Sequence, residues 1–77
     1  MQTKDLRLFY FSLPSIKAKD AFKAEFFNKT KLAYPTFYSY LNNAVRKIPF
    51  VYAEILKEIA IEQKPELYKS LFPEKIK

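Results

Sequence analysis

The sequence predicts an all-α fold, a compact bundle of about five short helices that contains a helix-turn-helix. Apolar residues recur at the 3.6-residue period of a helix along the chain, and no useful length alternates with period 2. Five prolines divide the sequence into pieces of helical length. A chain of 77 residues allows a single domain, 1–77, and its eight Phe and six Tyr provide a large apolar core for that length.

The first two helices are predicted from apolar spacing and from their end signals. The first has Thr3 as its N-cap and ends at Pro14. Its inward positions, at i, i+3, i+4 and i+7, are Leu6, Phe9, Tyr10 and Leu13. The second begins after an N-cap at Ser15 and ends between Asn28 and Lys31. Its inward positions are Ile16, Phe22 and Phe26.

Prolines start the remaining three helices. Pro35 and Pro49 each suit the first helical position, because the N–H that proline lacks has no partner there. Pro65 opens a short fifth helix. The inward residues of the third helix are Phe37, Tyr40, Leu41 and Ala44. Those of the fourth are Val51, Tyr52, Ile55, Leu56 and Ile59. Those of the fifth are Leu67, Tyr68, Leu71 and Phe72.

The residue types that are missing exclude most catalytic chemistry. The chain has no Cys, no His and no Gly, so it lacks thiol nucleophiles, the commonest metal ligands and any glycine-rich phosphate loop. Glu54, Glu58 and Glu62 share one helix face, which we interpret as solvated and not as a metal site. We therefore expect a binding module and not an enzyme, with no cofactor, no metal and no small-molecule substrate.

The cellular setting follows from two further absences. No apolar run approaches the roughly 20 residues that span a bilayer, so we expect no membrane association. The lack of cysteine fits a reducing compartment. The sequence therefore predicts a cytoplasmic protein.

The positive charge lies in the middle of the chain. The formal net charge is +6, and residues 17–47 contribute +5 of it, with seven basic and two acidic side chains. Such a field favours a polyanion as partner, because each neutralised phosphate releases counterions. The competing interpretation is a basic surface that serves solubility alone.

Residues 22–43 carry the most specific pattern. A helix is followed by the tight connection KTKLAY at 29–34, and then by a short helix that opens with Pro35 and Thr36. This resembles the helix-turn-helix of small repressors of the λ-repressor and Cro kind, in particular short Bacteroides-type phage or plasmid regulators with a T-F-Y-x-x-L reading helix. The resemblance places the motif within about 16–44. It implies buried positions at Phe26, Leu32, Phe37 and Tyr40.

The chain departs from that family at two positions. Phe27 stands where the family commonly has a small residue, because two backbones approach each other there. Lys31 stands where the family usually has a left-handed glycine. A non-glycine residue in that conformation costs about 1–2 kcal/mol.

The outward face of the third helix is predicted to read DNA bases. It carries hydroxyl and amide groups and no charge, which suits the floor of a groove, where bases offer hydrogen-bond donors and acceptors. The candidate base-reading residues are Tyr34, Thr36, Tyr38, Ser39, Asn42 and Asn43. The candidate phosphate-binding residues are Lys29, Lys31, Arg46 and Lys47. Because no Arg lies on this face, we expect modest specificity or a preference for A·T pairs.

Each of these assignments has a structural alternative. Thr36 is equally explained as a helix-capping hydroxyl, and the Asn42–Asn43 pair as residues that end a helix for backbone reasons. Tyr38 and Tyr40 are also explained as aromatics of the core or its rim, with Tyr40 the more buried.

The leading hypothesis is therefore a small transcriptional regulator, a repressor that binds double-stranded DNA. A homodimer is the usual way for a small module to gain enough contacts. Its candidate interface is formed by exposed aromatics near the termini, namely Phe9 to Phe11, Tyr68 and Phe72. The alternative is a protein-interaction module, an antitoxin or adaptor, that uses exposed aromatics. A third hypothesis is an RNA-binding protein that stacks bases on exposed Tyr.

Overall fold

Five helices make up the described part of the chain, residues 2–42 and 47–73 of a computed structural model. They are α1 (Thr3–Ser12), α2 (Ile16–Thr30), α3 (Tyr34–Leu41), α4 (Phe50–Gln63) and α5 (Pro65–Leu71). The described residues contain no strand, so the predicted all-α bundle is confirmed. None of the described helices is both long and apolar enough to cross a membrane.

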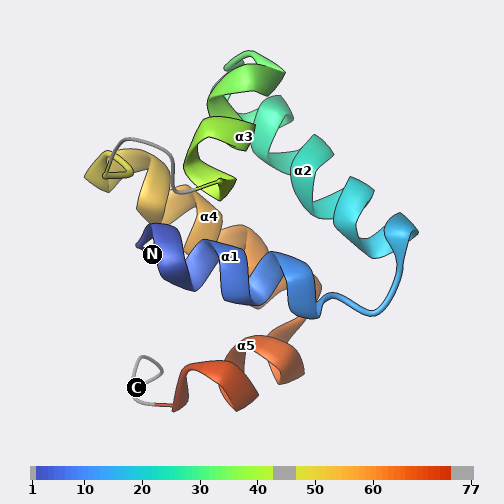
Figure 1. Cartoon of the computed structure of the whole chain (residues 1–77). Helices are drawn as coiled ribbons and strands as arrows, with labels where there is room; N and C mark the ends of the chain where they lie inside the picture. The colour runs from blue at the N-terminus through green and yellow to red at the C-terminus, as the bar shows by residue number, and fades with distance from the viewer. Residues whose placement is uncertain (1, 43–46, 74–77) are drawn as a thin grey trace.

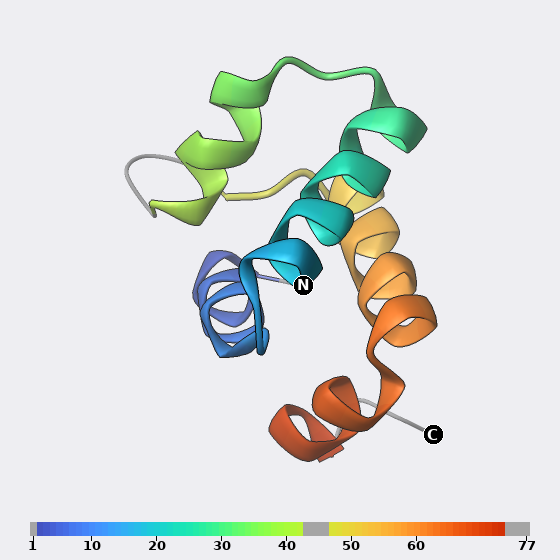
Figure 2. The same cartoon turned by 90° about the vertical axis from the view of Figure 1, so that its right-hand side faces the viewer.

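The helices pack around one core. Helix α2 packs against α4, whereas α1 packs against both α3 and α5, and α4 contacts α5. Both views place α3 and α5 at opposite ends of the molecule (Figures 1 and 2). The outer surface of α3 is therefore far from α5, which covers the opposite end of the core.

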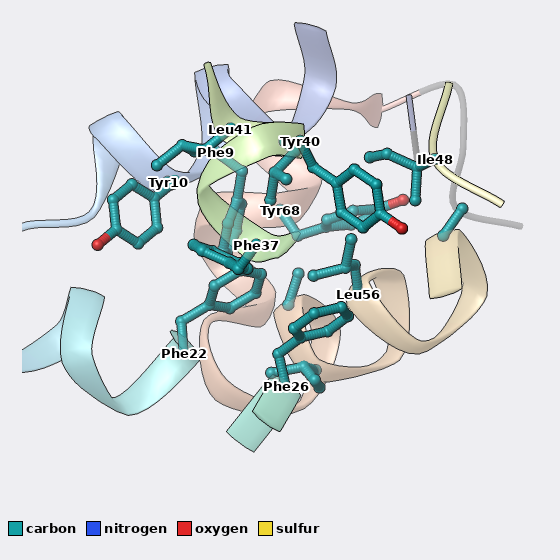
Figure 3. Packing of buried hydrophobic residues seen from close by; sticks show 14 of the residues in the cluster. Phe9, Tyr10, Phe22, Phe26, Phe37, Tyr40, Leu41, Ile48, Leu56 and Tyr68 are labelled. Carbon is teal, nitrogen blue, oxygen red and sulfur yellow. The ribbon is translucent and has the colours of Figure 1, made fainter. Parts of the chain in front are cut away.

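Aromatic rings fill the centre of this core. The Phe37 ring of α3 is fully buried. Its centroid lies 5.5 Å from that of Phe26, 5.6 Å from that of Tyr10 and 6.3 Å from that of Phe22. Figure 3 shows these rings gathered between α1, α2 and α3. Because each large ring buries much apolar area, a few of them hold three short helices together.

The predicted helix starts agree with the structure to within one residue. Ser15 caps α2, where its hydroxyl accepts a hydrogen bond of 3.1 Å from the Ala18 N–H. Pro65 is the first residue of α5. The predicted N-cap at Thr3 is wrong by one position, since Gln2 is the N-cap and Thr3 is buried inside α1.

Two other predicted helix starts are also displaced by one residue. Helix α3 begins at Tyr34, one residue before Pro35, whereas Pro49 is the N-cap of α4 and not its first helical residue. Both positions tolerate the missing proline N–H, so the sequence signal cannot distinguish them.

Two predicted inward positions are wrong. Ile16 and Val51 are exposed, by 76% and 64%. On α4 the predicted Leu56 and Ile59 are fully buried, and the predicted Tyr52 and Ile55 are half-buried against the core. The buried stripe of α4 also contains Ala53 and Ala60, which were not predicted. Ala44 lies outside the described residues.

The aromatics near the termini are buried and cannot form the predicted dimer interface. Phe9, Tyr10, Tyr68 and Phe72 all belong to the core, and Phe11 alone of the predicted set is exposed. Helix α5 accounts for this, because it covers α1 and brings the Tyr68 ring to 6.3 Å from that of Phe9.

Candidate nucleic-acid interface

A three-residue connection joins α2 to α3 and fixes the start of the candidate reading helix. Lys31 adopts the left-handed conformation, with φ 60° and ψ 19°, and its N–H donates to the Phe27 carbonyl at 2.8 Å. The Thr30 hydroxyl donates to the Phe26 carbonyl at 2.8 Å and accepts from the Leu32 N–H at 3.3 Å. Lysine therefore occupies the position that the resemblance assigned to glycine, and local hydrogen bonds support it.

Leu32 and Phe27 hold this connection against the core. Both are half-buried and pack against the core cluster. The Phe27 ring lies 5.9 Å from the Phe37 ring, so an aromatic contact joins α2 to α3 at the position where the family that the sequence resembles commonly has a small residue.

The predicted base-reading residues that the structure describes all lie on α3 or at its end. Tyr38 and Asn42 are exposed, and Thr36 and Ser39 are half-buried. Tyr34 is the first residue of α3. Asn43 and Arg46 lie outside the described residues.

A shallow hollow marks the middle of this face. It is lined by Pro35, Thr36, Ser39 and Tyr40. The N-cap of α3 is Ala33, so Thr36 does not cap the helix. Within residues 2–42 and 47–73, the hydroxyls of Thr36 and Ser39 make no side-chain hydrogen bond. Two hydroxyls are thus available to an incoming ligand at the hollow.

Asn42 has a backbone role and an exposed side chain. It is the C-cap of α3, and its N–H donates to the Tyr38 carbonyl at 2.9 Å. Asn42 therefore ends the helix through its backbone, as the alternative explanation predicted. Its side-chain amide lies at the surface. Tyr40 is buried and Tyr38 is exposed, as predicted for their relative burial.

The predicted phosphate-binding lysines differ in their surroundings. Lys29 forms an ion pair of 3.6 Å with Glu25 one helical turn away, and such exposed pairs are weak. Lys31 and Lys47 are exposed, and neither forms an ion pair within the described part of the chain.

The structure adds Lys23 of α2, which entered the sequence prediction only through the positive charge of residues 17–47. Its ammonium donates a 2.6 Å hydrogen bond to the Tyr38 hydroxyl and lies 3.8 Å from an Asp20 carboxylate oxygen. The hydrogen bond with Tyr38 raises the pKa of Lys23 above its ordinary value of 10.5, so this side chain is a cation at neutral pH.

Arg7 of α1 was also missed. Its guanidinium donates a 2.8 Å hydrogen bond to the Leu41 carbonyl in the last turn of α3. A cation at a helix C-terminus satisfies a free carbonyl and interacts favourably with the helix dipole. Arg7 and Lys23 thus hold α3 from two neighbouring helices.

Three glutamates lie along α4. Glu58 and Glu62 are exposed on α4, and Glu54 is half-buried. Among the described residues, no three His, Cys, Asp or Glu side chains lie together as a metal site. The surface of α3 and the connection before it therefore carries hydroxyls, amides and lysines, and the carboxylates of α4 lie elsewhere.

The chain matches no model of a known protein family, no curated protein and no solved structure. Its function therefore has to be inferred from its own side chains.

Proposed function

We propose that the chain is a cytoplasmic DNA-binding protein, a small transcriptional repressor of the helix-turn-helix kind that places α3 in the major groove. The observation that carries the proposal is the outward face of α3. It presents the hydroxyls of Thr36 and Ser39 and the amide of Asn42, and exposed lysines precede and follow it.

This arrangement separates the two kinds of contact that duplex DNA requires. Base edges in the major groove offer hydrogen-bond donors and acceptors, which hydroxyls and amides can satisfy. Phosphates lie on either side of the groove and require cations. Lys31 precedes α3 in the chain and Lys47 follows it, and we propose that these two lysines bind phosphates beside the groove.

The roles of the individual residues follow from their chemistry. Asn42 pairs with adenine through its amide, and Thr36 and Ser39 bond to base edges from the hollow. Tyr38 contacts a phosphate or a thymine methyl beside them. Tyr34 and Asn43 complete the base-reading set. Lys29, Lys31, Arg46 and Lys47 contact phosphates.

The proposal includes a homodimer on a two-fold DNA site, because one module of this size makes few phosphate contacts. Its interface does not consist of Phe9, Tyr10, Tyr68 and Phe72, since these side chains form the core.

Fluorescence anisotropy of labelled random-sequence duplex tests the proposal, at about 50 and 200 mM salt. We expect binding that weakens steeply with salt, and Lys31→Gln to reduce the slope of log affinity against log salt by about 0.9. The matched control is Lys69→Gln, which removes an exposed charge from α5 at the opposite end of the molecule (Figure 1). Absence of binding at the lower salt with high micromolar protein would contradict the proposal.

Base reading needs a second measurement after a preferred site has been selected. We expect the double substitution of Thr36 and Ser39 by Ala to reduce the preference for that site over random duplex by about tenfold, from hydrogen bonds worth 1–3 kcal/mol per base pair. Binding to random duplex should change little. Equal losses on both duplexes would show that these hydroxyls do not read sequence.

A second candidate function is protein binding, and one observation favours it. Phe50 and Val51 stand side by side at the start of α4 and are 77% and 64% exposed. Adjacent exposed apolar residues are typical of contact sites. If duplex binding is absent, affinity capture with the wild-type chain and with Phe50→Ser would show whether Phe50 and Val51 bind a partner protein.

A further inference from the structure

Cations and aromatic rings alternate along one surface that crosses α1, α2 and α3, and we call it the ring–cation strip. Its members are Arg7, Phe11, Tyr10, Lys19, Lys23 and Tyr38. The Phe11 ring centroid lies 5.6 Å from the Arg7 guanidinium carbon and 5.7 Å from the Lys19 ammonium. The Lys23 ammonium lies 5.1 Å from the Tyr38 ring centroid. Each of the two exposed rings of the strip, Phe11 and Tyr38, thus has at least one cation beside it.

The strip is continuous. Lys19 also lies 6.0 Å from the Tyr10 ring centroid, and Tyr10 and Phe11 contact each other edge to face at 5.4 Å. Lys19 and Lys23 are one helical turn apart on the same face of α2, which carries the strip from Phe11 to Tyr38. Figure 3 shows the Tyr10 ring at the edge of the core with its hydroxyl pointing away from it.

Two of its rings are accessible. Phe11 is 55% exposed and Tyr38 is 39% exposed, whereas most other aromatic side chains with described burial are enclosed or half-enclosed. Arg7, Lys19 and Lys23 lie 5.1–5.7 Å from the centroids of these two rings, and the Asp20 carboxylate lies 3.8 Å from the Lys23 ammonium. The strip therefore combines positive charge with open ring surface.

Open ring surface and positive charge together fit a ligand that has flat apolar faces linked by regularly spaced negative charges. A single-stranded nucleic acid has that chemistry, since its bases stack on aromatic side chains while its phosphates pair with lysine and arginine. A duplex keeps its base faces stacked inside and offers Phe11 nothing to stack on. The exposed rings thus favour a single strand over a duplex at this surface.

We propose that the ring–cation strip binds single-stranded nucleic acid, with bases on Phe11 and Tyr38 and phosphates on Arg7, Lys19 and Lys23. This goes beyond duplex binding by the outward face of α3, because the two surfaces use different residues except for Tyr38.

Anisotropy of a labelled twelve-residue oligothymidylate, titrated with the full chain, tests the strip. Base–aromatic stacking is worth about 1–3 kcal/mol per base, so we expect Phe11→Leu to weaken binding by about tenfold. Leucine keeps an apolar side chain and removes only the ring. The control Phe50→Leu makes the same change at an exposed ring of α4, outside the strip, and should leave the affinity unchanged. Thermal melting of each variant by circular dichroism verifies that it is folded.

Two substitutions that each remove one positive charge complete the test. We expect Lys19→Gln to lower the affinity and to reduce the salt slope by about 0.7, the value for one phosphate of a single strand. Lys17→Gln removes an exposed charge on the opposite side of the same helix and should change neither quantity. Equal effects of Lys17→Gln and Lys19→Gln would show that only total charge matters and would overturn the proposal.

Further outcomes distinguish this surface from the rest of the molecule. If oligothymidylate does not bind at about 50 mM salt, the proposal for the ring–cation strip is wrong, whether or not duplex DNA binds. If polyglutamate displaces the oligonucleotide as well as unlabelled oligothymidylate does, an acidic polypeptide is the partner and the proposal is wrong. If oligothymidylate binds and duplex does not, only the proposed function of α3 fails.

Discussion

The ammonium of Lys23 on α2 donates a 2.6 Å hydrogen bond to the hydroxyl of Tyr38 on α3. This bond joins the two helices on the side away from their connection at Lys31. Together with the bond from Arg7 to the Leu41 carbonyl, it fixes the rotation of α3 about its own axis. The face that α3 presents to a ligand thus depends on two cations from neighbouring helices.

Replacing Tyr38 by Phe removes the bond and keeps the ring. We expect the free energy of unfolding to fall by about 1 kcal/mol, because the bond is charge-assisted but partly exposed to water. Urea unfolding followed by circular dichroism measures the change. Lys29→Gln, which breaks only the exposed pair with Glu25, should alter stability by no more than about 0.5 kcal/mol. Equal changes in the two variants would mean that the Lys23 bond contributes nothing specific.

Stability should be lost at alkaline pH. The hydrogen bond with Tyr38 raises the pKa of Lys23 above 10.5, and burial raises the pKa of Tyr10 above 10.0. In both cases the folded state holds the proton more tightly than the unfolded chain does. Their contribution is therefore fully present below about pH 10 and is lost as the pH rises through the folded-state values.

The measurement is the free energy of unfolding from pH 6 to pH 11. The chain contains no His and no Cys, so we expect little change between about pH 6 and 9, followed by a decline above pH 10. In Tyr38→Phe the part of the decline that belongs to Lys23 should be smaller. A steep change near pH 7 would contradict this prediction.

Lys31→Gly should stabilise the protein. The left-handed conformation of Lys31 costs a side-chain-bearing residue about 1–2 kcal/mol, and glycine avoids this cost but gains flexibility in the unfolded chain. We expect a net increase of roughly 0.5–1 kcal/mol in the free energy of unfolding. Duplex affinity should fall in the same variant, because a proposed phosphate contact is removed.

Lys29→Gly is the matched control for this change. It lies two residues earlier, inside the last turn of α2, where glycine weakens a helix by about 1 kcal/mol. The two glycine substitutions should therefore change stability in opposite directions. A loss of stability in both would show that the left-handed position is not a source of strain.

Phe37 should be among the most sensitive positions of the core. It is fully buried and lies next to the rings of Tyr10, Phe22, Phe26 and Phe27. Replacing a buried Phe by Ala costs about 3–5 kcal/mol, which approaches the whole stability of a small domain. We expect Phe37→Ala to be largely unfolded at 25 °C by circular dichroism.

Phe50→Ala provides the comparison, since its ring is 77% exposed. The melting temperature should change by only a few degrees, because few buried contacts are lost. A cooperative native transition in Phe37→Ala with an unchanged midpoint would contradict the central place of that ring.

The order of the helices could be predicted because their signals are local. Ser15 caps α2 with its own hydroxyl, and Pro65 opens α5 because of its missing N–H. The rotation of α4 could be predicted only in part. Val51 is more hydrophobic than Ala53 and Ala60, yet Val51 is 64% exposed and both alanines are buried, so the hydrophobicity of single residues did not show where the edge of the buried stripe lies.

Only those features of the candidate site that depend on a single helix could be predicted from the sequence. The outward positions of Asn42 and Tyr38 follow from the helical period once Phe37 is placed inward. The contact between Lys23 and Tyr38 spans 15 residues and depends on how α2 and α3 are oriented. The burial of Phe9 likewise depends on α5, which is distant in sequence. The local spacing of apolar residues could not show this contact, so Phe9 was predicted to lie in a dimer interface.

The contact between Phe9 and Tyr68 gives the chain an order of assembly. The Phe9 and Tyr68 rings lie 6.3 Å apart, and the Phe72 ring lies 5.0 Å from the Tyr68 ring. A ribosome makes the α1 segment first and the α5 segment last of the described helices. The partners of α1 on α2 and α3 are therefore available before Tyr68 is. The core around Phe9 is completed only when the final helix has been made.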